Sequence, residues 1–408
     1  MQRKTVSGIM LTLLVIGMLS LTFIIQPVKA ATLIVPDSYS TIQAAVNAAL
    51  PGDTIIVRVG TYTENVKVNK DHLTIKSESG SELTIVQAAY SYNDVFQVTG
   101  DYVSLSGFTV KGASEEYHAG INLQWNLSVG PPAGNCNISN NIVSNNYWGI
   151  YLNSSEDNII ANNKVMNNRY GIVMIDTLLD YRSNNTIANN SLVNNTRSGI
   201  TLRGSSFNVI RNNEIHENGK SDTRLLCGIE LVPSRNNDIV NNNFRGCGFN
   251  VFFSESHDNK VEGNIVNGRP LVYLENVEDT EVTDAGQVVL VKCKGITVMN
   301  CSLSYTSAGI ELYQSSNCRI ENNICENEGF AGIFLTFSSN NNTVINNTCG
   351  NNKMDEWVRP GIRVEISEDN TILNNRISEC KWGISTIVSS NNSLYLNNFM
   401  DNQNNVYN

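Results

Sequence analysis

Apolar and polar positions repeat along most of the chain. A phrase of Gly, Ile, any residue and an aliphatic residue recurs, and its apolar members alternate with residues on the opposite face, as in a β-strand. The copies begin at Gly149, Gly171, Gly199, Gly228, Gly309, Gly332, Gly361 and, in a weaker form, Gly383. The shortest intervals are 22 residues (Gly149 to Gly171) and 23 residues (Gly309 to Gly332). Such a period indicates one structural unit stacked on its neighbours.

One repeat holds three short strands and three turns. After the Gly149 strand come a Ser-rich turn at residues 154–157, a strand from Asn158, a bend at 162–163 and a strand around Val165. This content predicts an all-β fold, a right-handed, single-stranded parallel β-helix of about 22–24 residues per coil. A leucine-rich repeat has a similar period, but its Leu-x-x-Leu-x-Leu frame is absent.

Pairs of Asn mark the bends between strands. Asn tolerates the left-handed backbone of a sharp corner, and its amide can bond the same amide one coil away to form a ladder. The alternative is an Asn-rich disordered tract, which the phased aliphatic residues Ile142, Val165 and Leu192 contradict. The pairs are Asn140-Asn141, Asn162-Asn163, Asn189-Asn190, Asn212-Asn213, Asn241-Asn242, Asn322-Asn323, Asn346-Asn347, Asn374-Asn375 and Asn397-Asn398.

The first thirty residues have the pattern of a secretory signal peptide. Arg3 and Lys4 precede an apolar run over residues 9–25, and a small-residue cleavage pattern ends at Ala30. The alternative is an uncleaved membrane anchor, because the run approaches the length of a membrane span. With cleavage before Ala31, residues 31–408 form the β-helix, and the protein is expected to be secreted or held at the cell surface.

The N-terminal end of the repeat region differs from the rest. Residues 41–50 are Ala-rich with Ile42, Val46 and Leu50 on one face, which predicts a capping helix with Ser40 as its N-cap. Residues 31–58 therefore form the N-terminal cap and the first strand. Residues 269–291 blur the repeat and predict an irregular coil, and no linker separates domains.

The charge balance is acidic. The chain has 28 Lys and Arg against 38 Asp and Glu, a net charge of −10, and loss of Arg3, Lys4 and Lys29 with the signal peptide lowers it to −13. The absence of a basic cluster argues against a nucleic-acid partner. An acidic protein also repels polyanionic substrates at long range unless a cation mediates.

Nine cysteines follow the signal segment. In an oxidising compartment, disulfides between successive coils are possible, and the repeat register suggests Cys227 with Cys247 and Cys325 with Cys349. Buried free thiols are the alternative. No Cys-x-x-Cys or His/Cys grouping indicates zinc.

Several framework motifs resemble a known family. They are residues 42–45 leading to Pro51-Gly52-Asp53-Thr54-Ile55, residues 60–64, the Asn-x-Ile-x-Asn-Asn repeats, and residues 268–273 leading to Asp284-Ala285-Gly286. The chain from about Thr32 onward resembles the NosD-like group of carbohydrate-binding and sugar-hydrolase (CASH) repeat proteins in the pectate-lyase-like superfamily, which abound in archaea. The resemblance implies the fold strongly and an activity weakly, because these are framework residues.

Catalytic motifs of that superfamily are absent. The polygalacturonase motifs Asn-Thr-Asp, Asp-Asp, Gly-His-Gly and Arg-Ile-Lys do not occur. The only acid pair on one C-terminal stretch of Gly-Ile strands is Glu311 and Glu365, with Arg363 beside Glu365. Strand geometry separates the two acids by roughly 11–12 Å, more than the ~5–9.5 Å of glycosidase carboxylates. Arg363 and Glu365 are expected to form a solvated surface ion pair.

The outward positions of the Gly-Ile strands are the favoured ligand-binding surface. They combine aromatic, amide and charged side chains, which stack on sugar rings and bond their hydroxyl groups. The predicted ligand-binding residues are Tyr151, Arg203, Glu230, Tyr313 and Phe334.

Metal ligands and modification sites are less defined. His72, His118, His216 and His257 are scattered and Met residues do not cluster, so no metal site is predicted, copper is disfavoured and calcium stays open. Of ten Asn-x-Ser/Thr sequons, Asn153 and Asn391 are predicted glycosylation positions, whereas Asn189 is assigned to the ladder.

The sequence therefore predicts an exported structural and carbohydrate-binding module. Its expected partner is an extracellular polysaccharide or cell-surface glycan, and it meets a membrane only through an uncleaved signal segment. A polysaccharide lyase or glycoside hydrolase is the first alternative, and a NosD-like periplasmic protein of copper binding or maturation is the second.

Overall fold

The chain forms a stack of short parallel strands. The computed structural model describes residues 30–124, 134–176, 183–220, 226–251, 256–352 and 359–407. All but one of the strand pairs among these residues are parallel, and one short helix stands near the N-terminus. This confirms the right-handed parallel β-helix. The predicted signal segment, apart from Ala30, lies outside the described residues.

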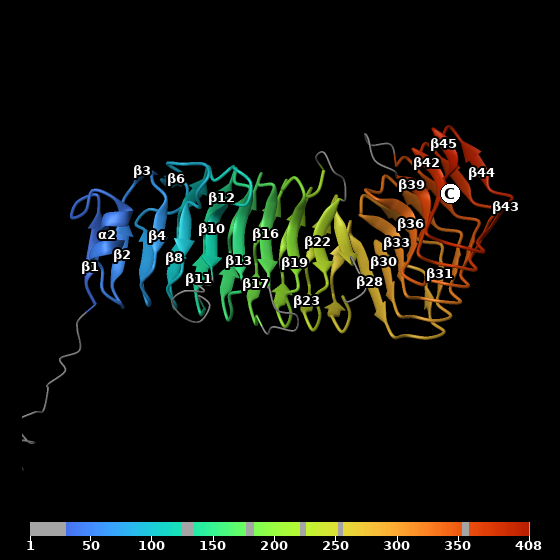
Figure 1. The fold of residues 1–408 in the computed structure, drawn as a ribbon, viewed down its shortest axis with the longest axis horizontal. Helices are drawn as coiled ribbons and strands as arrows, with labels where there is room; N and C mark the ends of the chain where they lie inside the picture. Colours follow the sequence, from blue (N-terminus) through green and yellow to red (C-terminus); the bar gives the residue numbers. More distant parts are fainter. Residues whose placement is uncertain are drawn as a thin grey trace, which may run out of the picture.

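Three sheets build the first stack, which runs from blue to yellow in Figure 1. The ten-stranded sheet contains β1 (Thr32–Val35), β2 (Thr54–Val57), β5 (Thr74–Ser77), β8 (Ser104–Ser106), β11 (Asn137–Ser139), β14 (Ile159–Ala161), β17 (Thr186–Ala188), β20 (Val209–Arg211), β23 (Asp238–Val240) and β26 (Lys260–Glu262). The eight-stranded sheet contains β4 (Val66–Val68), β7 (Phe96–Val98), β10 (Ala119–Gln124), β13 (Trp148–Asn153), β16 (Tyr170–Ile175), β19 (Ser198–Arg203), β22 (Cys227–Val232) and β25 (Gly248–Val251).

The third sheet has sixteen strands and extends into the second stack. Its first-stack strands are β3 (Gly60–Thr63), β6 (Thr84–Gln87), β9 (Thr109–Lys111), β12 (Ile142–Ser144), β15 (Lys164–Met166), β18 (Ser191–Val193), β21 (Glu214–His216), β24 (Asn243–Arg245) and β27 (Ile265–Val266). Its second-stack strands are β28 (Arg269–Glu275), β30 (Gln287–Val291), β33 (Ala308–Tyr313), β36 (Ala331–Thr336), β39 (Pro360–Glu365), β42 (Trp382–Ile387) and β45 (Asn404–Tyr407).

Two smaller sheets complete the second stack, which is orange to red in Figure 1 and turned relative to the first. The six-stranded sheet contains β29 (Glu281–Val282), β31 (Thr297–Met299), β34 (Arg319–Glu321), β37 (Thr343–Ile345), β40 (Thr371–Leu373) and β43 (Ser393–Tyr395). The five-stranded sheet contains β32 (Ser302–Ser304), β35 (Ile324–Glu326), β38 (Thr348–Gly350), β41 (Arg376–Ser378) and β44 (Asn398–Met400).

The core of each stack is formed by the inward residues of the three strands of each coil. Ile150 of β13, Ile160 of β14 and Val165 of β15 are fully buried members of one cluster. The Gly that opens each Gly-Ile phrase is required by the close approach of the next coil. A Cβ on Gly171 would lie 2.3 Å from the carbonyl oxygen of Gly199, a distance that no side chain could tolerate.

The two Asn of each pair have different roles. Asn189 has φ of 57° and is exposed, so it makes the corner. The neighbouring Asn190 is buried, accepts the backbone N–H of Asn163 at 2.9 Å and donates Nδ2 to Asn213 Oδ1 at 3.1 Å. The assignment of Asn189 to the ladder was therefore wrong, because the ladder amide belongs to the second residue of the pair, and the Asn189 side chain is exposed.

The same ladder geometry recurs at other corners. One ladder runs through Asn141, Asn163, Asn190, Asn213, Asn242 and Asn264, with each amide bonded to the next coil. In the second stack, Ser hydroxyl groups form a shorter ladder in which Ser315 N donates to Ser339 Oγ and Ser339 N donates to Ser367 Oγ, both at 3.1 Å. Buried backbone groups at the corners thus find partners that strands alone could not supply.

The N-terminal cap is a helix of two turns. Helix α2 spans Ile42–Ala48 and buries Ile42, Ala45 and Val46. Its N-cap is Thr41, whose Oγ1 accepts Ala44 N at 3.0 Å, and not Ser40 as the sequence suggested. Strand β1 precedes this helix and pairs with β2, so the first strand lies earlier than predicted.

The two stacks meet at a hairpin. Strands β27 and β28 pair antiparallel through Asn267 and Gly268, whose φ values of 51° and 85° suit a tight two-residue turn. Beyond this turn, Gly-Ile strands continue the sixteen-stranded sheet, whereas in the first stack they belong to the eight-stranded sheet. Residues 269–291, which blur the repeat, directly follow this reversal and contain the first strands of the second stack.

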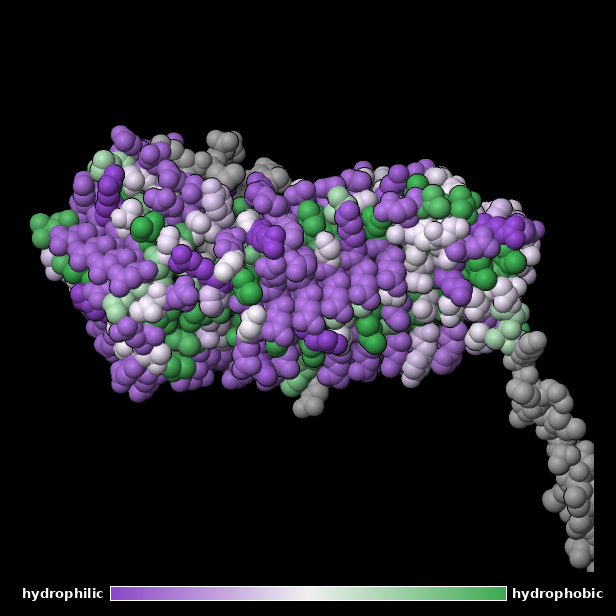
Figure 2. Space-filling model, turned by 180° about the vertical axis from the view of Figure 1, so that it is seen from behind, coloured by the Kyte–Doolittle hydropathy of each residue, from purple (hydrophilic) through white to green (hydrophobic). Residues whose placement is uncertain are grey.

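The outer face of the second stack closes the open end of the first. Val289, Val291 and Tyr313 point away from the second stack's own core and belong to the hydrophobic cluster of the first stack, together with Phe249 and Val251. The junction is therefore a packed interface and not a linker. Seen from behind relative to Figure 1, the surface of the molecule is largely hydrophilic, with hydrophobic residues in small groups (Figure 2).

Within the described part of the chain, no helix has the length and apolar character needed to span a membrane.

Replacement of Asn190 by Ala should lower stability far more than replacement of Asn189 by Gly. The first change leaves the buried N–H of Asn163 and the carbonyl of Ile160 without their side-chain partner, at about 2–6 kcal/mol for two orphaned groups. The second keeps the left-handed corner, because Gly adopts positive φ freely. Urea unfolding followed by circular dichroism measures both. Equal midpoints for the two variants would contradict the division of roles.

Candidate functional site

The predicted outward columns of the Gly-Ile strands are in register. In the second stack, Glu311, Phe334 and Arg363 are direct neighbours across β33, β36 and β39. Two residues further on, Tyr313, Thr336 and Glu365 form a second column on the same face. Glu275 of β28 pairs with Val291, and Val291 pairs with Tyr313, so the second column begins at Glu275. The sequence placed these side chains correctly on one face, but it did not predict their burial.

The aromatic candidate of the first stack is packed and not free. Tyr151 lies on the outer face of β13, where its ring centroid is 4.2 Å from that of Trp148 within a cluster that includes Tyr170. Burial raises the pKa of Tyr151 to about 12. The expectation of an exposed sugar platform at Tyr151 is therefore wrong, because neighbouring aromatic side chains cover it.

Polar groups follow on the same outer face. Thr201 Oγ1 donates to Glu230 Oε2 at 3.2 Å, and burial raises the pKa of Glu230. Arg203 is half-buried, and its Nε has no hydrogen-bond partner. Glu230 is buried too, so it is not the exposed ligand that the sequence suggested.

Two carboxyl groups on this face were missed from the sequence. Asp94 accepts Asn122 Nδ2 at 2.7 Å, and Asp176 accepts Ser183 Oγ at 2.5 Å. Burial raises the pKa of both. Asp94 comes just before the fully buried Val95, and Asp176 directly follows β16, so their positions at strand ends were the available signal.

The second-stack candidates are buried because the first stack ends against them. Gln287 of β30 accepts Phe249 N at 2.8 Å and donates to Phe249 O at 2.7 Å, which continues the hydrogen bonding of strand β25. Beneath this contact, Glu311 and Tyr313 are each only 1% exposed. Both were expected on the surface, and the packing of one stack on the other removes them from it.

Glu311 is an unusual buried acid. Among the described residues, neither of its carboxylate oxygens has a hydrogen-bond partner of normal geometry, and burial raises its pKa to about 8. The nearby backbone of Val251 has a smaller, opposite effect on this pKa. Glu311 is enclosed, whereas the Glu365 side chain is 27% exposed and lines the groove described below, which Glu311 does not line.

A groove opens where the interface between the stacks ends. Its walls are Val251 of the first stack and six residues on or beside β36 and β39, and its volume is about 240 Å³. We call this the junction groove, lined by Val251, Phe330, Phe334, Thr336, Phe337, Arg363 and Glu365. Three sequence candidates (Phe334, Arg363 and Glu365) therefore meet in one cavity.

Charged groups line one side of the junction groove. Arg363 contacts Glu365 Oε2 through Nη2 at 2.8 Å and through Nε at 2.9 Å, with side chains 14% and 27% exposed. The guanidinium carbon lies 4.6 Å from the ring centroid of Phe330. The pair is thus a partly desolvated part of the groove and not the solvated surface pair expected.

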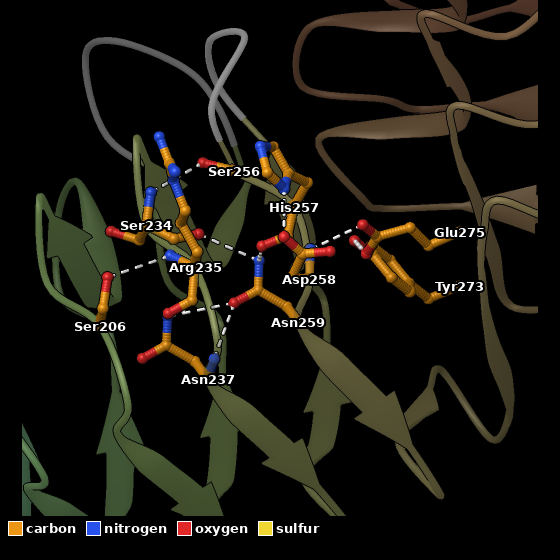
Figure 3. Close-up of polar contacts among 10 residues, drawn as sticks. All are labelled: Ser206, Ser234, Arg235, Asn237, Ser256, His257, Asp258, Asn259, Tyr273 and Glu275. Atoms are coloured by element: carbon orange, nitrogen blue, oxygen red, sulfur yellow. Dashed lines mark hydrogen bonds and ion pairs between the residues drawn. The ribbon is translucent and has the colours of Figure 1, made fainter. Parts of the chain in front are cut away.

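A second, separate group of side chains joins the two stacks. His257 and Asp258 come from the turn before β26, and Glu275 is the last residue of β28. One potential ligand atom from each lies within 4.8 Å of the others. Figure 3 shows the three side chains together at the boundary of the two stacks. The sequence treated His257 as one of four scattered histidines, because Glu275 is distant in the chain.

The cysteines are all thiols. The nine cysteines are free and buried, so the proposed pairs Cys227–Cys247 and Cys325–Cys349 are not disulfides in this structure. Cys325 and Cys349 are nevertheless direct neighbours on adjacent strands. A hydrogen bond with Cys349, together with burial, raises the pKa of Cys325 well above its usual value, which keeps the thiol protonated.

The two predicted glycosylation positions differ in accessibility. Asn391 is exposed, while Asn153, at the end of β13, is half-buried.

The fold defines a parallel β-helix protein, and its two stacks form a groove at their junction. The family profile described as "Periplasmic copper-binding protein (NosD)" matches residues 46–246 and 250–408. The chain belongs to this NosD family. None of the curated proteins matches the chain.

Three solved structures are similar to this chain over at least two thirds of its length. The catalytic unit of a GH87 α-1,3-glucanase from Streptomyces thermodiastaticus is 12% identical with a TM-score of 0.47, covering 94% of this chain and 69% of its own. The A-module of a mannuronan C-5 epimerase from Azotobacter vinelandii is 14% identical with a TM-score of 0.44, covering 90% and 94%. Pectate lyase Pel9A is 14% identical with a TM-score of 0.41, covering 69% and 74%. Likeness at this level does not extend beyond the fold.

The family description raises the question of where copper would fit. Cuprous copper prefers thiolate and thioether ligands, but burial raises the pKa of thiols such as Cys227 and Cys247, which disfavours the thiolate form. The group of His257, Asp258 and Glu275 offers imidazole nitrogen and carboxylate oxygen, which suit a divalent ion. These residues therefore fit cupric and not cuprous copper, and a bound ion would supply Lewis acidity there.

Stability should fall as pH rises from 5 to 8, and replacement of Glu311 by Gln should reduce that slope. A carboxyl whose folded pKa of about 8 exceeds its ordinary value of 4.5 destabilises the folded state progressively between those two values. For this one carboxyl group, the free energy of unfolding falls by at most about 1.4 kcal/mol per pH unit. Thermal unfolding at each pH measures it.

Glu328 has a pKa of about 8 for the same reason, burial, so the Glu311→Gln variant retains part of the slope. Replacement of both acids by Gln should flatten the profile further. If the Glu311→Gln variant and the unchanged protein have the same slope, Glu311 is not buried as described.

Proposed function

We propose that the protein is an exported β-helix that binds glycan, with the junction groove as its binding site. The observation that carries the proposal is the composition of this groove. It combines aromatic rings, a paired Arg and Glu and a buried hydroxyl group without a partner in one cavity. Sugar-binding sites need stacking surfaces together with donors and acceptors for hydroxyl groups.

Aromatic rings form the apolar part of the groove. Phe330 and Phe334 lie edge to face with centroids 5.0 Å apart, and Phe337 packs on the buried Tyr313 at 5.3 Å. These contacts fix the rings before any ligand arrives, which reduces the entropy lost on binding. Apolar C–H faces of a sugar ring are suited to such a surface.

The polar part of the groove is balanced in charge. Arg363 and Glu365 neutralise each other while leaving further guanidinium N–H groups and a second carboxylate oxygen for a ligand. Thr336 is 2% exposed, and its Oγ1 has no hydrogen-bond partner among the residues that the structure describes. A buried polar atom of this kind calls for an explanation such as a ligand or water.

This balance favours a neutral glycan. The chain carries a net charge of −10, and the groove adds no net positive charge that would attract uronate groups. The groove volume of about 240 Å³ is below the roughly 300–1,000 Å³ of pockets for drug-sized ligands. It is therefore suited to one sugar unit of a longer chain.

The proposed location is outside the cytoplasm. The N-terminal segment has the pattern of a signal peptide, and the family is described as periplasmic. A polysaccharide or cell-surface glycan is available there. Secretion and attachment at the cell surface are both compatible with this proposal.

An enzyme that cleaves polysaccharides is the second candidate. The outer face of the eight-stranded sheet carries Asp94, Asp176 and Glu230, and burial raises the pKa of each. Raised carboxyl pKa values are typical of general acids. If cleavage is found, these three residues become the first catalytic candidates.

Phe334→Ala should weaken glycan binding at least tenfold, because it removes the central ring of the groove. Arg363→Lys should also weaken it, because Lys lacks the planar fork of donors. Residues 31–408 are incubated with neutral and acidic polysaccharides, with and without calcium, and analysed by size-exclusion chromatography with mass detection. Isothermal titration with the polymer that binds then measures affinity.

Tyr395→Ala is the matched control, since Tyr395 is an exposed aromatic residue of the same stack outside the groove. It should bind as the unchanged protein does. Binding that survives both groove variants would exclude the groove, and failure to bind any polymer would exclude the proposed function. Shortened polymer would instead identify an enzyme.

A further inference from the structure

His257, Asp258 and Glu275 come from opposite sides of the junction. His257 and Asp258 belong to the last complete coil of the first stack, and Glu275 ends the first strand of the second stack. One ligand atom of each lies within 4.8 Å of the others. Asp258 N also donates to Glu275 Oε1 at 2.6 Å, so the two segments already touch at this point.

The surrounding structure holds these side chains in place. On either side of His257 and Asp258, Ser256 and Asn259 are ladder residues, which accept Ser234 N at 3.2 Å and Asn237 N at 3.0 Å. On the other side, Tyr273 donates its hydroxyl to Glu275 Oε2 at 2.8 Å, as Figure 3 shows. Outer contacts that orient potential ligands in this way are typical of metal sites.

The donor set determines the class of ion. One imidazole nitrogen and two carboxylates form a borderline set that suits Zn²⁺, Cu²⁺ or Ni²⁺. Calcium prefers six to eight oxygen ligands, which this group does not offer. Three protein ligands leave coordination positions open to water.

We propose that this group binds one divalent transition-metal ion, which ties the first stack to the second. This inference is independent of the glycan proposal. A bound ion would join two segments that the chain connects only through the β27–β28 hairpin, so it would stabilise the junction by mass action. The junction groove lies on the same sheet, where Thr336 follows Glu275, Val291 and Tyr313 in one column.

The test measures metal binding directly. The untagged chain of residues 31–408 is stripped with a chelator, dialysed and titrated calorimetrically with ZnCl₂, CuCl₂ and CaCl₂. We expect one Zn²⁺ or Cu²⁺ per chain and no calcium binding at this site. His257→Ala and Glu275→Gln should each weaken binding at least tenfold.

His216→Ala is the matched control. His216 Nε2 lies 3.0 Å from Glu214 Oε2, so it is a histidine paired with a carboxylate at the surface. Among the described residues, no third ligand group lies beside this pair. This variant should bind the ion as the unchanged protein does. Glu275→Gln keeps the size of the side chain, so it tests the site even if His257→Ala folds poorly.

Thermal unfolding supplies a second readout. The ion should raise the melting temperature of the unchanged chain and of His216→Ala, but not that of His257→Ala or Glu275→Gln. Absence of stoichiometric binding by the unchanged chain would overturn the proposal. Equal affinity of His257→Ala, Glu275→Gln and the unchanged chain would also overturn it, because the ion would then bind elsewhere.

Discussion

From Asn141 onward, the coils depend on hydrogen bonds that satisfy backbone groups at their corners. Strands can pair with strands above and below, but at each sharp corner the backbone N–H groups turn inward, away from water. Buried Asn side chains accept these N–H groups and donate to carbonyl groups one coil away, as Asn163 and Asn190 do. Without them, each coil would bury several orphaned polar groups at about 1–3 kcal/mol apiece. The aliphatic core can form only because the corners are satisfied.

A stack of coils has open ends, and this chain closes them in two ways. At the N-terminus, the short helix α2 covers the first coil. In the middle of the chain, the hairpin at Asn267 and Gly268 reverses direction, and the outer face of the second stack covers the end of the first. Val289 and Tyr313 therefore point outward from their own stack yet lie within a continuous core.

This closure produces the features on which function is proposed. Where the two stacks separate, aromatic and charged residues line the junction groove. Where they touch again at the turn before β26, side chains from both stacks come within ligand distance of one another. Membership of the NosD family agrees with the β-helix but does not by itself assign either feature to a ligand. The proposed roles rest on local chemistry at the junction.

The sequence by itself determined the repeat, the inward residues and the register of the columns. These follow from local rules, since alternation along a strand and a fixed period place Ile150 inside and Phe334 beside Arg363 without knowledge of distant contacts. The Asn-Gly hairpin at residues 267–268 was also readable, because this dipeptide is a strong hairpin signal, but the repeat pattern obscured it.

Only the tertiary structure decided which outward residues are exposed. Glu311 and Tyr313 obey the same alternation as Phe334, yet they are enclosed because Phe249 and Val251 of the first stack pack beside them. The proximity of His257 to Glu275 has the same origin, since the hairpin brings the two stacks together. Periodicity specifies the direction of a side chain relative to its own coil. It contains no information about what another part of the chain places above it.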